Sequence, residues 1–450
     1  MKKLFGTDGI RGIANDFLTY GLAMSVGEAL GEILSKRENV PKVIIGTDTR
    51  ESGEMLKNAL GNGLTRLGCE VLDVGVVSTP AVAFLTTSTH SDAGVMISAS
   101  HNPFEYNGIK IFGKEGFKLS DEDEEIIEGM IYENLPKKST PQNPGKMISA
   151  KNLKDDYVNY LRSFAPESFD NLSVVIDCAN GSAANTAKEI FNFPGLNVKF
   201  IGCEPNGTNI NLECGSTHLE ILREEVLKSN ANLGIAFDGD ADRCLAIDEN
   251  GNEVDGDFIM AILSLMLKEN NMLHGNTVVG TVMSNYGFSK FCRDFGINFV
   301  ATKVGDRYVL EEIEKCAYNF GGEQSGHIIL RNAATTGDGQ LTALYLLSRM
   351  NETKKKLSEL ASVMKKFPQH MVNISATPSQ KAAFGTSEKI AEVLENANKT
   401  LKNTGRILVR PSGTEPLVRI MVESSDAKLT VSLCKSVAEN IKEILSSVED

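Results

Sequence analysis

The stretch that decides the fold reads Gly94-Val-Met-Ile-Ser-Ala-Ser-His-Asn-Pro-Phe-Glu-Tyr-Asn-Gly-Ile-Lys-Ile-Phe-Gly113. The apolar run Val95–Ile97 predicts a short buried strand. The polar cluster Ser98–Asn102, closed by Pro103, is expected to end that strand in an extended loop. Ser100 is therefore predicted at a strand end, where its side chain faces solvent or a ligand.

The second half of this stretch is expected to return toward the first. Asn107-Gly108 is a frequent turn pair, so it predicts a turn into a second apolar run that brings Lys110 alongside Ser100. The simplest alternative is an ordinary polar loop. A Ser-His-Asp hydrolase is a further alternative, but the Gly-x-Ser-x-Gly elbow is absent around Ser100 and residues adjacent in the chain rarely form a catalytic dyad.

Length and composition narrow the class of protein. A chain of 450 residues is too long for one ordinary core, so three or four domains are expected. The net charge of −13 argues against general nucleic-acid binding. Eight cysteines without a Cys-x-x-Cys pair are typical of reduced thiols, which predicts a cytoplasmic protein. The longest apolar run, Phe258–Leu267, is too short to span a membrane, and no signal peptide is recognised.

Strand and helix patterns alternate along most of the chain, which predicts an α/β fold class. After Phe367-Pro368 the pattern changes to that of a small α+β domain. The expected fold is three mixed α/β domains followed by the smaller α+β domain, arranged around a central cleft. The expected boundaries are 1–150, 151–253, 254–367 and 368–450.

An acidic loop follows a predicted buried strand. Asp238, Asp240 and Asp242 alternate along it, so their charges would repel one another unless they share a hard cation. An EF-hand loop is the main alternative, with Glu249 at its last ligand position. That alternative fails because Arg243 stands where the loop needs glycine and the flanking segments have strand patterns. The pattern favours Mg²⁺, which binds few carboxylates and completes its octahedron with water and phosphate oxygens.

Two further clusters offer groups that suit a sugar phosphate. Glu323, Ser325 and His327 lie among glycines and supply donors and acceptors for hydroxyl groups. A second loop combines guanidinium groups, hydroxyls and free amides, which suits a phosphate, although a basic hairpin tip explains it about as well. Its residues are Arg410, Ser412, Gly413, Thr414 and Arg419.

Five segments together resemble the loops of the α-D-phosphohexomutase family, in that family's order. They are Phe5-Gly-Thr-Asp-Gly-Ile-Arg-Gly12, Ser98-Ala-Ser-His-Asn-Pro103, Asp238-Gly-Asp-Ala-Asp-Arg243, Gly322-Glu-Gln-Ser-Gly-His327 and Arg410-Pro-Ser-Gly-Thr-Glu415. The resemblance spans the whole chain and points to the bacterial amino-sugar branch of the family. It implies three similar α/β domains, a smaller last domain and a catalytic phosphoserine at Ser100.

By the same resemblance, one Mg²⁺ per active site would lie between the phosphate of Ser100 and the three aspartates. The expected catalytic residues are Ser100, Lys110, Arg11, Arg243 and His101. The implied reaction interconverts glucosamine 6-phosphate and glucosamine 1-phosphate through a hexosamine 1,6-bisphosphate, for UDP-N-acetylglucosamine synthesis. Lys110 is either the general base or only a positive charge. The family suggests a homodimer that binds small-molecule sugar phosphates.

Two alternatives stay open at this stage. The first is phosphomannomutase or phosphoglucomutase activity, since the shared loops recognise phosphate and hydroxyl groups that all these sugars carry. The second, from another class, is a non-catalytic sugar-phosphate-binding protein. That second hypothesis explains the sugar and phosphate loops but leaves the serine and the acidic triad without a role.

Overall fold

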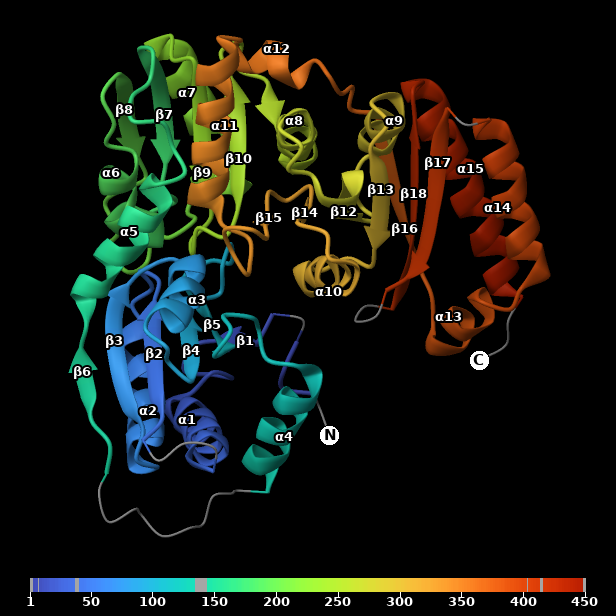
Figure 1. The fold of residues 1–450 in the computed structure, drawn as a ribbon. Helices are drawn as coiled ribbons and strands as arrows, with labels where there is room; N and C mark the ends of the chain where they lie inside the picture. The colour runs from blue at the N-terminus through green and yellow to red at the C-terminus, as the bar shows by residue number, and fades with distance from the viewer. Residues whose placement is uncertain are drawn as a thin grey trace. The chain divides into compact units, whose positions relative to one another are not determined.

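A computed structural model describes residues 3–6, 8–36, 40–133, 144–402, 404–412 and 416–447. The chain forms two compact units. The first unit comprises Met1–Met283 with Ile297–Val363, and the second comprises Ser284–Gly296 with Met364–Asp450. The described residues form four β-sheets, and Figure 1 shows the strands of each sheet as a group of arrows.

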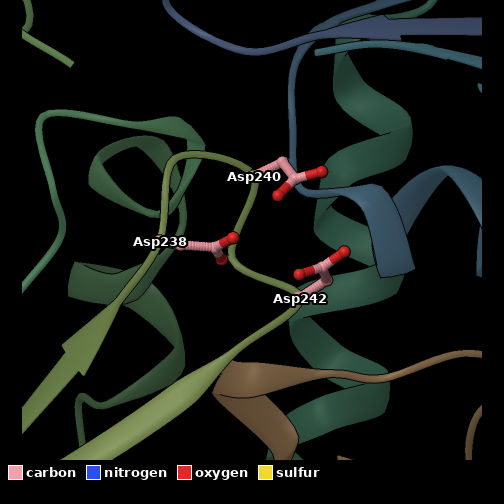
Figure 2. A group of neighbouring side chains, drawn as sticks. All are labelled: Asp238, Asp240 and Asp242. Atoms are coloured by element: carbon pink, nitrogen blue, oxygen red, sulfur yellow. The ribbon is translucent and has the colours of Figure 1, made fainter. Parts of the chain in front are cut away.

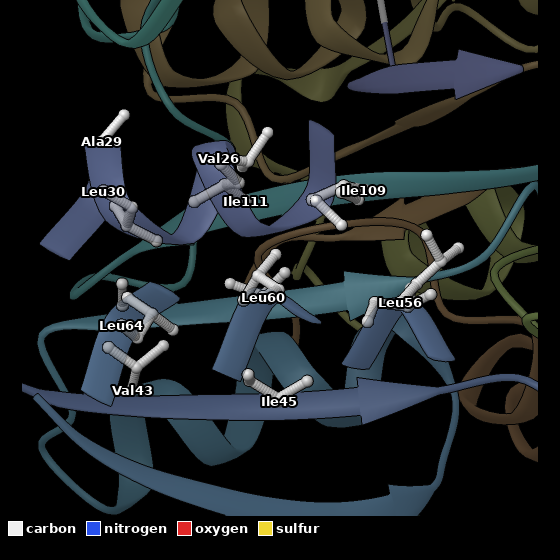
Figure 3. Packing of buried hydrophobic residues seen from close by; sticks show 14 of the residues in the cluster. Val26, Ala29, Leu30, Val43, Ile45, Leu56, Leu60, Leu64, Ile109 and Ile111 are labelled. Atoms are coloured by element: carbon white, nitrogen blue, oxygen red, sulfur yellow. The ribbon is translucent and has the colours of Figure 1, made fainter. Parts of the chain in front are cut away.

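The first sheet has six strands in the order β1-β5-β4-β2-β3-β6. Its strands are β1 Ile10–Ile13, β2 Lys42–Thr47, β3 Glu70–Val76, β4 Ala93–Ile97, β5 Tyr106–Gly113 and β6 Met147–Ser149. The accompanying helices are α1 Tyr20–Ser35, α2 Gly53–Arg66, α3 Thr79–Ser88 and α4 Asp121–Tyr132. Figure 3 shows the core, in which apolar side chains of α1 and α2 meet those of β2 and β5. Burying these side chains stabilises the sheet whose strand ends carry the functional loops.

The expected turn at Asn107-Gly108 is wrong, because both residues lie inside β5. The Asn107 side chain donates to Ser52 Oγ at 2.8 Å, and Gly108 pairs with Arg11 of β1. A Cβ atom on Gly108 would lie 2.5 Å from the carbonyl oxygen of Ser98. Gly108 is therefore needed for close strand packing. Pairing with β1 and β4 overrides the local turn preference.

The second sheet has five strands in the order β11-β10-β9-β7-β8, and the third has four in the order β13-β12-β14-β15. The strands of the second sheet are β7 Leu172–Asp177, β8 Leu196–Ile201, β9 Leu233–Phe237, β10 Cys244–Asp248 and β11 Glu253–Val254; the helices near it in the chain are α5 Lys154–Arg162, α6 Ala187–Ile190 and α7 Glu220–Ser229. The third sheet is formed by β12 Thr277–Thr281, β13 Asn298–Thr302, β14 Phe320–Gly322 and β15 Ile328–Leu330, with α8 Gly256–Glu269, α10 Asp306–Cys316, α11 Gly339–Thr353 and α12 Leu357–Ala361. Parallel and antiparallel pairs occur in both sheets. Both are therefore mixed α/β sheets, as the alternating pattern predicted.

The second unit is built on a three-stranded antiparallel sheet with the order β16-β18-β17. Its elements are β16 Gln369–Ser375, β17 Gly405–Pro411, β18 Leu417–Ser424, α9 Tyr286–Asp294, α13 Pro378–Phe384, α14 Glu388–Leu401 and α15 Ala427–Ser446. Asn285 joins α9 to this unit, since its side chain exchanges hydrogen bonds with the backbone of Phe367 at 2.8 and 3.1 Å. Apolar side chains of α14 and α15 pack with those of β18 in a separate core.

The predicted fold class is confirmed. Three mixed sheets with helices form the α/β part, and a smaller antiparallel sheet with helices forms the α+β part that follows. The boundaries at 150, 253 and 367 stay predictions. Within the described ranges, every helix is too short or too polar to be a candidate for crossing a membrane.

Candidate active site

Ser100 lies in the loop between β4 and β5, in the left-handed backbone region with φ of 53°. This conformation is uncommon for residues other than glycine. Ser98 helps to hold it, since its Oγ accepts the Ser100 N–H at 3.0 Å. Ser100 was expected to face solvent or a ligand, and the structure excludes the first, because only 1% of its surface is exposed.

The carbonyl groups of the Ser100 loop are held by two side chains from distant parts of the chain. Arg50, which is paired with buried Asp48 at 2.9 Å, donates to the carbonyl oxygens of Ser100 at 2.9 Å and Asn102 at 2.8 Å. Asn211 donates to the same two oxygens at 2.9 and 3.1 Å. These bonds fix the direction of the Ser100 side chain.

The acidic loop joins β9 to β10, two antiparallel strands, so the rejection of an EF-hand is confirmed. Asp238, Asp240 and Asp242 are buried and offer ligand oxygens that all lie within 4.8 Å of one another. Figure 2 shows the three carboxyl groups converging from this one loop. Gly239 lets the loop approach Ser100, because a Cβ atom there would lie 2.6 Å from the Ser100 carbonyl oxygen.

The carboxyl groups have the features that a hard cation requires. Asp240 Oδ1 and Asp242 Oδ1 are covered, and neither has a hydrogen-bond partner in the part of the chain that the structure describes. Burial raises the pKa of Asp238 well above its ordinary value, and Asp242 and Asp240 raise it further. Ser100 Oγ donates to Asp238 Oδ2 at 2.6 Å. A divalent cation bound by the three carboxylates would thus lie beside Ser100 Oγ.

Lys110 lies on β5, opposite Met96 of β4, and its side chain is 1% exposed. Its Nζ donates to Asp240 Oδ2 at 2.7 Å and Asp242 Oδ2 at 3.3 Å. Burial disfavours the charged amine, but Asp240, Asp8 and Asp242 outweigh burial and raise the Lys110 pKa well above its ordinary value. In this arrangement Lys110 is a cation.

Two arginines extend the positive charge around the site. Arg11, on β1, forms an ion pair with Asp8. Arg243 Nε lies 3.8 Å from Asp238 Oδ2 and 3.9 Å from Asp242 Oδ1. Among the described residues, no hydrogen-bond partner exists for the buried Nε atom of either arginine. These donors are therefore available to an anionic ligand.

His101 follows Ser100 directly, and its Nδ1 lies 3.3 Å from Ser100 Oγ. Burial lowers the His101 pKa to about 4, and the charges of Arg243 and Arg11 contribute to this shift. The ring is consequently neutral near pH 7 and is a weak base there.

His327 connects the acidic loop to the third sheet. Its Nδ1 lies 3.6 Å from Asp242 Oδ1, and its Nε2 lies 3.6 Å from Asp306 Oδ2. Burial disfavours the charged ring, but these carboxylates outweigh burial and raise the His327 pKa to about 9. Gly337 N–H nevertheless donates to Nε2 at 3.0 Å, which requires an unprotonated nitrogen. This hydrogen bond assigns a neutral ring with its proton on Nδ1 in this structure, and it opposes the protonation that the two carboxylates favour.

A cavity of about 410 Å³ in the first unit is lined by some of these groups, but Ser100, Lys110, Asp238 and Asp240 are not among its lining residues. It is lined by Asp8, Arg11, His101, Asp242, Arg243, Thr281, Met283, Val304, Gly305, Asp306, Glu323, Gln324, Ser325 and His327. Glu323 Oε1 accepts the Gly305 N–H at 3.2 Å, whereas the buried Oγ of Ser325 has no hydrogen-bond partner among the described residues. The cavity therefore combines cations with donors and acceptors suited to hydroxyl groups.

The candidate phosphate loop belongs to the second unit. Arg410 of β17 and Arg419 of β18 are direct cross-strand partners. Like charges at such positions repel each other, so a shared anion would stabilise the pair. Ser412 is buried and its N–H donates to the carbonyl oxygen of Leu417 at 2.8 Å. Gly413 and Thr414 lie outside the described residues.

Sequence reasoning missed several residues that organise the site. Asp8, Lys118 and Asp306 form an ion network, in which Lys118 Nζ donates to both carboxylates. Arg50 acts from the loop between β2 and α2, and Thr79 acts from the first position of α3. Two sequence signals could have found Asp8 and Asp48. Gly-Thr-Asp occurs at Gly6 and again at Gly46, followed by Arg11 and Arg50, and Asp8 also lies in the segment Phe5–Gly12 that resembles the family.

Four family models match successive parts of the chain. They describe domains I, II and III, each alpha/beta/alpha, and the C-terminal domain of phosphoglucomutase/phosphomannomutase. The matched residues are 2–137, 155–251, 255–367 and 348–440, respectively.

The chain is also similar to complete curated proteins. It is 49% identical over 450 residues to a phosphoglucosamine mutase of Thermoanaerobacter sp. (strain X514), covering 99% of this chain and 100% of that protein. It is likewise 49% identical over 449 residues to a phosphoglucosamine mutase of Brevibacillus brevis, with 99% and 100% covered.

Solved structures support the fold at lower identity. A phosphoglucomutase/phosphomannomutase family protein from Burkholderia thailandensis superposes with a TM-score of 0.81 at 21% identity, covering 100% of this chain and 99% of that one. An N-acetylphosphoglucosamine mutase from Aspergillus fumigatus, in complex with GlcNAc-6P and magnesium, gives a TM-score of 0.63 at 16% identity, covering 98% and 95%.

Proposed function

Because the chain belongs to the phosphoglucosamine mutase family, we propose that Ser100 carries the phosphoryl group in the interconversion of glucosamine 6-phosphate and glucosamine 1-phosphate. The observation that supports this role best is the Ser100 hydroxyl, which lies 2.6 Å from Asp238 Oδ2 at the edge of the acidic triad. A hexosamine 1,6-bisphosphate would be the intermediate. The product would supply UDP-N-acetylglucosamine synthesis.

Asp238, Asp240 and Asp242 would hold one Mg²⁺, which neutralises charge on the transferring phosphoryl group when it is bound. Lys110, Arg11 and Arg243 would stabilise the remaining negative charge, since phosphoryl transfer depends mainly on positioning and electrostatics. The proposed sugar and phosphate contacts are Glu323, Ser325, His327, Arg410, Ser412, Gly413, Thr414 and Arg419.

The first transfer breaks the bond between phosphorus and Ser100 Oγ and forms a bond between phosphorus and a sugar hydroxyl oxygen. The proton of that hydroxyl ends on Ser100 Oγ. The second transfer returns the other phosphate of the bisphosphate to Ser100. The neutral His101 ring, with Nδ1 3.3 Å from Ser100 Oγ, is placed to hydrogen-bond to that hydroxyl. Lys110 acts as a positive charge and not as the general base, because its raised pKa keeps the amine protonated.

The experiment is phosphate labelling of the protein with ³²P-labelled hexose 1,6-bisphosphate. Acid-stable label should appear on Ser100 of the wild type, and Ser100→Ala should lose both the label and the mutase turnover while remaining folded. Ser35→Ala, which removes an exposed hydroxyl, is the matched control. Near-normal turnover of Ser100→Ala would remove the phosphoserine from the mechanism. Absence of both label and turnover in the wild type would favour a sugar-phosphate-binding protein.

Substrate preference is tested separately. Glucosamine, glucose and mannose phosphates should be assayed side by side, and glucosamine phosphate is expected to give the highest kcat/KM. A higher value for glucose or mannose phosphate would support the phosphoglucomutase or phosphomannomutase alternative. A cytoplasmic location and a homodimer remain part of the proposal.

A further inference from the structure

Thr79, the first residue of α3, contacts the acidic loop at two points. Its Oγ1 donates to Asp240 Oδ2 at 2.5 Å, and its N–H donates to the Asp240 carbonyl oxygen at 2.9 Å. Neither residue is exposed to solvent. Thr79 therefore holds both the backbone and the side chain of Asp240.

The two oxygens of the Asp240 carboxylate are in different environments. Oδ2 accepts hydrogen bonds from Thr79 Oγ1 and from Lys110 Nζ at 2.7 Å. Oδ1 is buried and has no hydrogen-bond partner in the part of the chain that the structure describes. Because Oδ2 is occupied by two donors, Oδ1 is the oxygen left for a cation.

A purely structural contact is the alternative explanation for Thr79. The bond from the Thr79 N–H to the Asp240 carbonyl oxygen would by itself join α3 to the loop. The hydroxyl bond adds something different, since it fixes the rotation of the carboxylate. Groups that hydrogen-bond to a metal ligand commonly orient that ligand and tune its affinity for the metal.

We propose that Thr79 is a positioning residue for the cation, because its hydroxyl holds Asp240 Oδ2 and thereby presents Oδ1 to the metal. This inference rests on the proposed function, which places a divalent cation at Asp238, Asp240 and Asp242. It assigns a role to a side chain that lies 161 residues from Asp240 in the sequence.

The test is Mn²⁺ binding to the full-length protein, followed by the electron paramagnetic resonance signal of free Mn²⁺. Mn²⁺ serves as the probe because it accepts oxygen ligands similar to those of Mg²⁺. Thr79→Val keeps the shape of the side chain and the backbone bond but removes the hydroxyl. The Kd for Mn²⁺ should rise by about 10- to 100-fold in this variant. Thr79→Ser retains the hydroxyl and should bind Mn²⁺ nearly as well as the wild type.

Thr86→Val is the matched control. Thr86 is a buried threonine of the same helix, and its hydroxyl donates to the Val82 carbonyl oxygen at 2.7 Å. Its loss should leave the Kd for Mn²⁺ unchanged. If Thr79→Val does not fold, Thr79→Ala provides the same comparison with a smaller side chain.

An unchanged Kd in folded Thr79→Val or Thr79→Ala, with a wild type that binds Mn²⁺, would overturn the role of Thr79 and leave the metal site standing. A loss of affinity in Thr79→Ser as large as that in Thr79→Val would also overturn it, because the hydroxyl would then be irrelevant. A wild type that does not bind Mn²⁺ would overturn the metal site itself together with this inference.

Discussion

The guanidinium group of Arg50 donates to the carbonyl oxygen of Ser100 at 2.9 Å, although 50 residues separate them in the sequence. The same group donates to the Asn102 and Pro103 carbonyl oxygens. Asp48 compensates its charge, since it accepts from Arg50 Nε at 2.9 Å. Arg50 therefore fixes the backbone of the Ser100 loop, and only a planar group with several donors can make all these bonds.

Arg50→Lys should consequently reduce turnover without greatly changing substrate affinity. Lysine keeps the charge but loses the planar arrangement of donors, so the Ser100 side chain would be held less accurately. Since a displacement of about 1 Å can cost on the order of 100-fold in rate, kcat should fall by about 10- to 100-fold with KM nearly unchanged. Steady-state kinetics measure both values. Arg66→Lys is the control, because Arg66 is half exposed and pairs with Glu28 away from the loop. Wild-type kcat in Arg50→Lys would contradict this role.

Asp240→Asn should weaken the dependence on Mg²⁺. The substitution keeps the shape of the side chain but removes one negative charge from the group of carboxylates that would hold the cation. The Mg²⁺ concentration for half-maximal activity should rise by more than about tenfold, or the dependence should disappear. Asp170→Asn, at an exposed carboxylate paired with Lys354, should titrate as the wild type does. If Asp240→Asn gives the wild-type Mg²⁺ curve, the cation binds elsewhere.

The stability of the folded protein should depend on pH through the buried carboxyl group of Asp338. Burial raises its pKa to about 6, although hydrogen bonds from Leu341 N–H and Tyr157 Oη at 2.9 Å each oppose the shift. The folded protein therefore binds this proton more tightly than the unfolded chain does. Its contribution to stability is complete below about pH 4 and is lost as the pH rises through about 6.

The corresponding measurement compares wild type with Asp338→Asn in urea unfolding between about pH 4.5 and pH 7.5. Because one pKa unit is worth about 1.4 kcal/mol, the free energy of unfolding of the wild type should fall relative to the variant by about 2 kcal/mol over this range. The amide of the variant carries no titrating proton, so the difference between the curves isolates the carboxyl group. Parallel curves would mean that Asp338 keeps an ordinary pKa in the folded protein.

Local sequence features predicted the parts of the site that are local in the chain. The apolar run before Ser98 placed Ser100 at the end of β4, and the spacing of Asp238, Asp240 and Asp242 predicted the converging carboxylates that the structure shows. These predictions succeed because a strand end and an alternating turn depend on neighbours in sequence.

The remaining features depend on partners that are distant in the sequence. Ser100 is buried because Arg50 and Asn211, 50 and 111 residues away, bind its carbonyl group. The Asn107-Gly108 pair has a strong turn preference, yet pairing with β1 and β4 holds it in β5. Such contacts leave no periodic pattern, so only the folded structure identifies them.

Arg419 provides the last prediction, which concerns recognition of phosphate by the second unit. Arg419 of β18 and Arg410 of β17 are cross-strand partners, so two positively charged residues occupy facing positions of this sheet. A phosphate bound there would neutralise the repulsion between them. The bisphosphate must present each of its phosphates to Ser100 in turn, and the role proposed for these arginines is to bind a phosphate group of either monophosphate.

Arg419→Ala should therefore raise KM for glucosamine 6-phosphate and for glucosamine 1-phosphate together. A charge-assisted contact is worth roughly 1.5–3 kcal/mol, which corresponds to about a 10- to 100-fold loss of affinity. Ser412→Ala should have a smaller effect of the same kind.

The fraction of bisphosphate released per turnover by Arg419→Ala should also rise, because the intermediate is held less tightly. Isotope-labelled bisphosphate measures this release. Lys442→Ala removes one exposed cation from α15 of the same unit and should change neither quantity. If Arg419→Ala also changes neither, β17 and β18 end in a structural hairpin and the phosphate is bound by other residues.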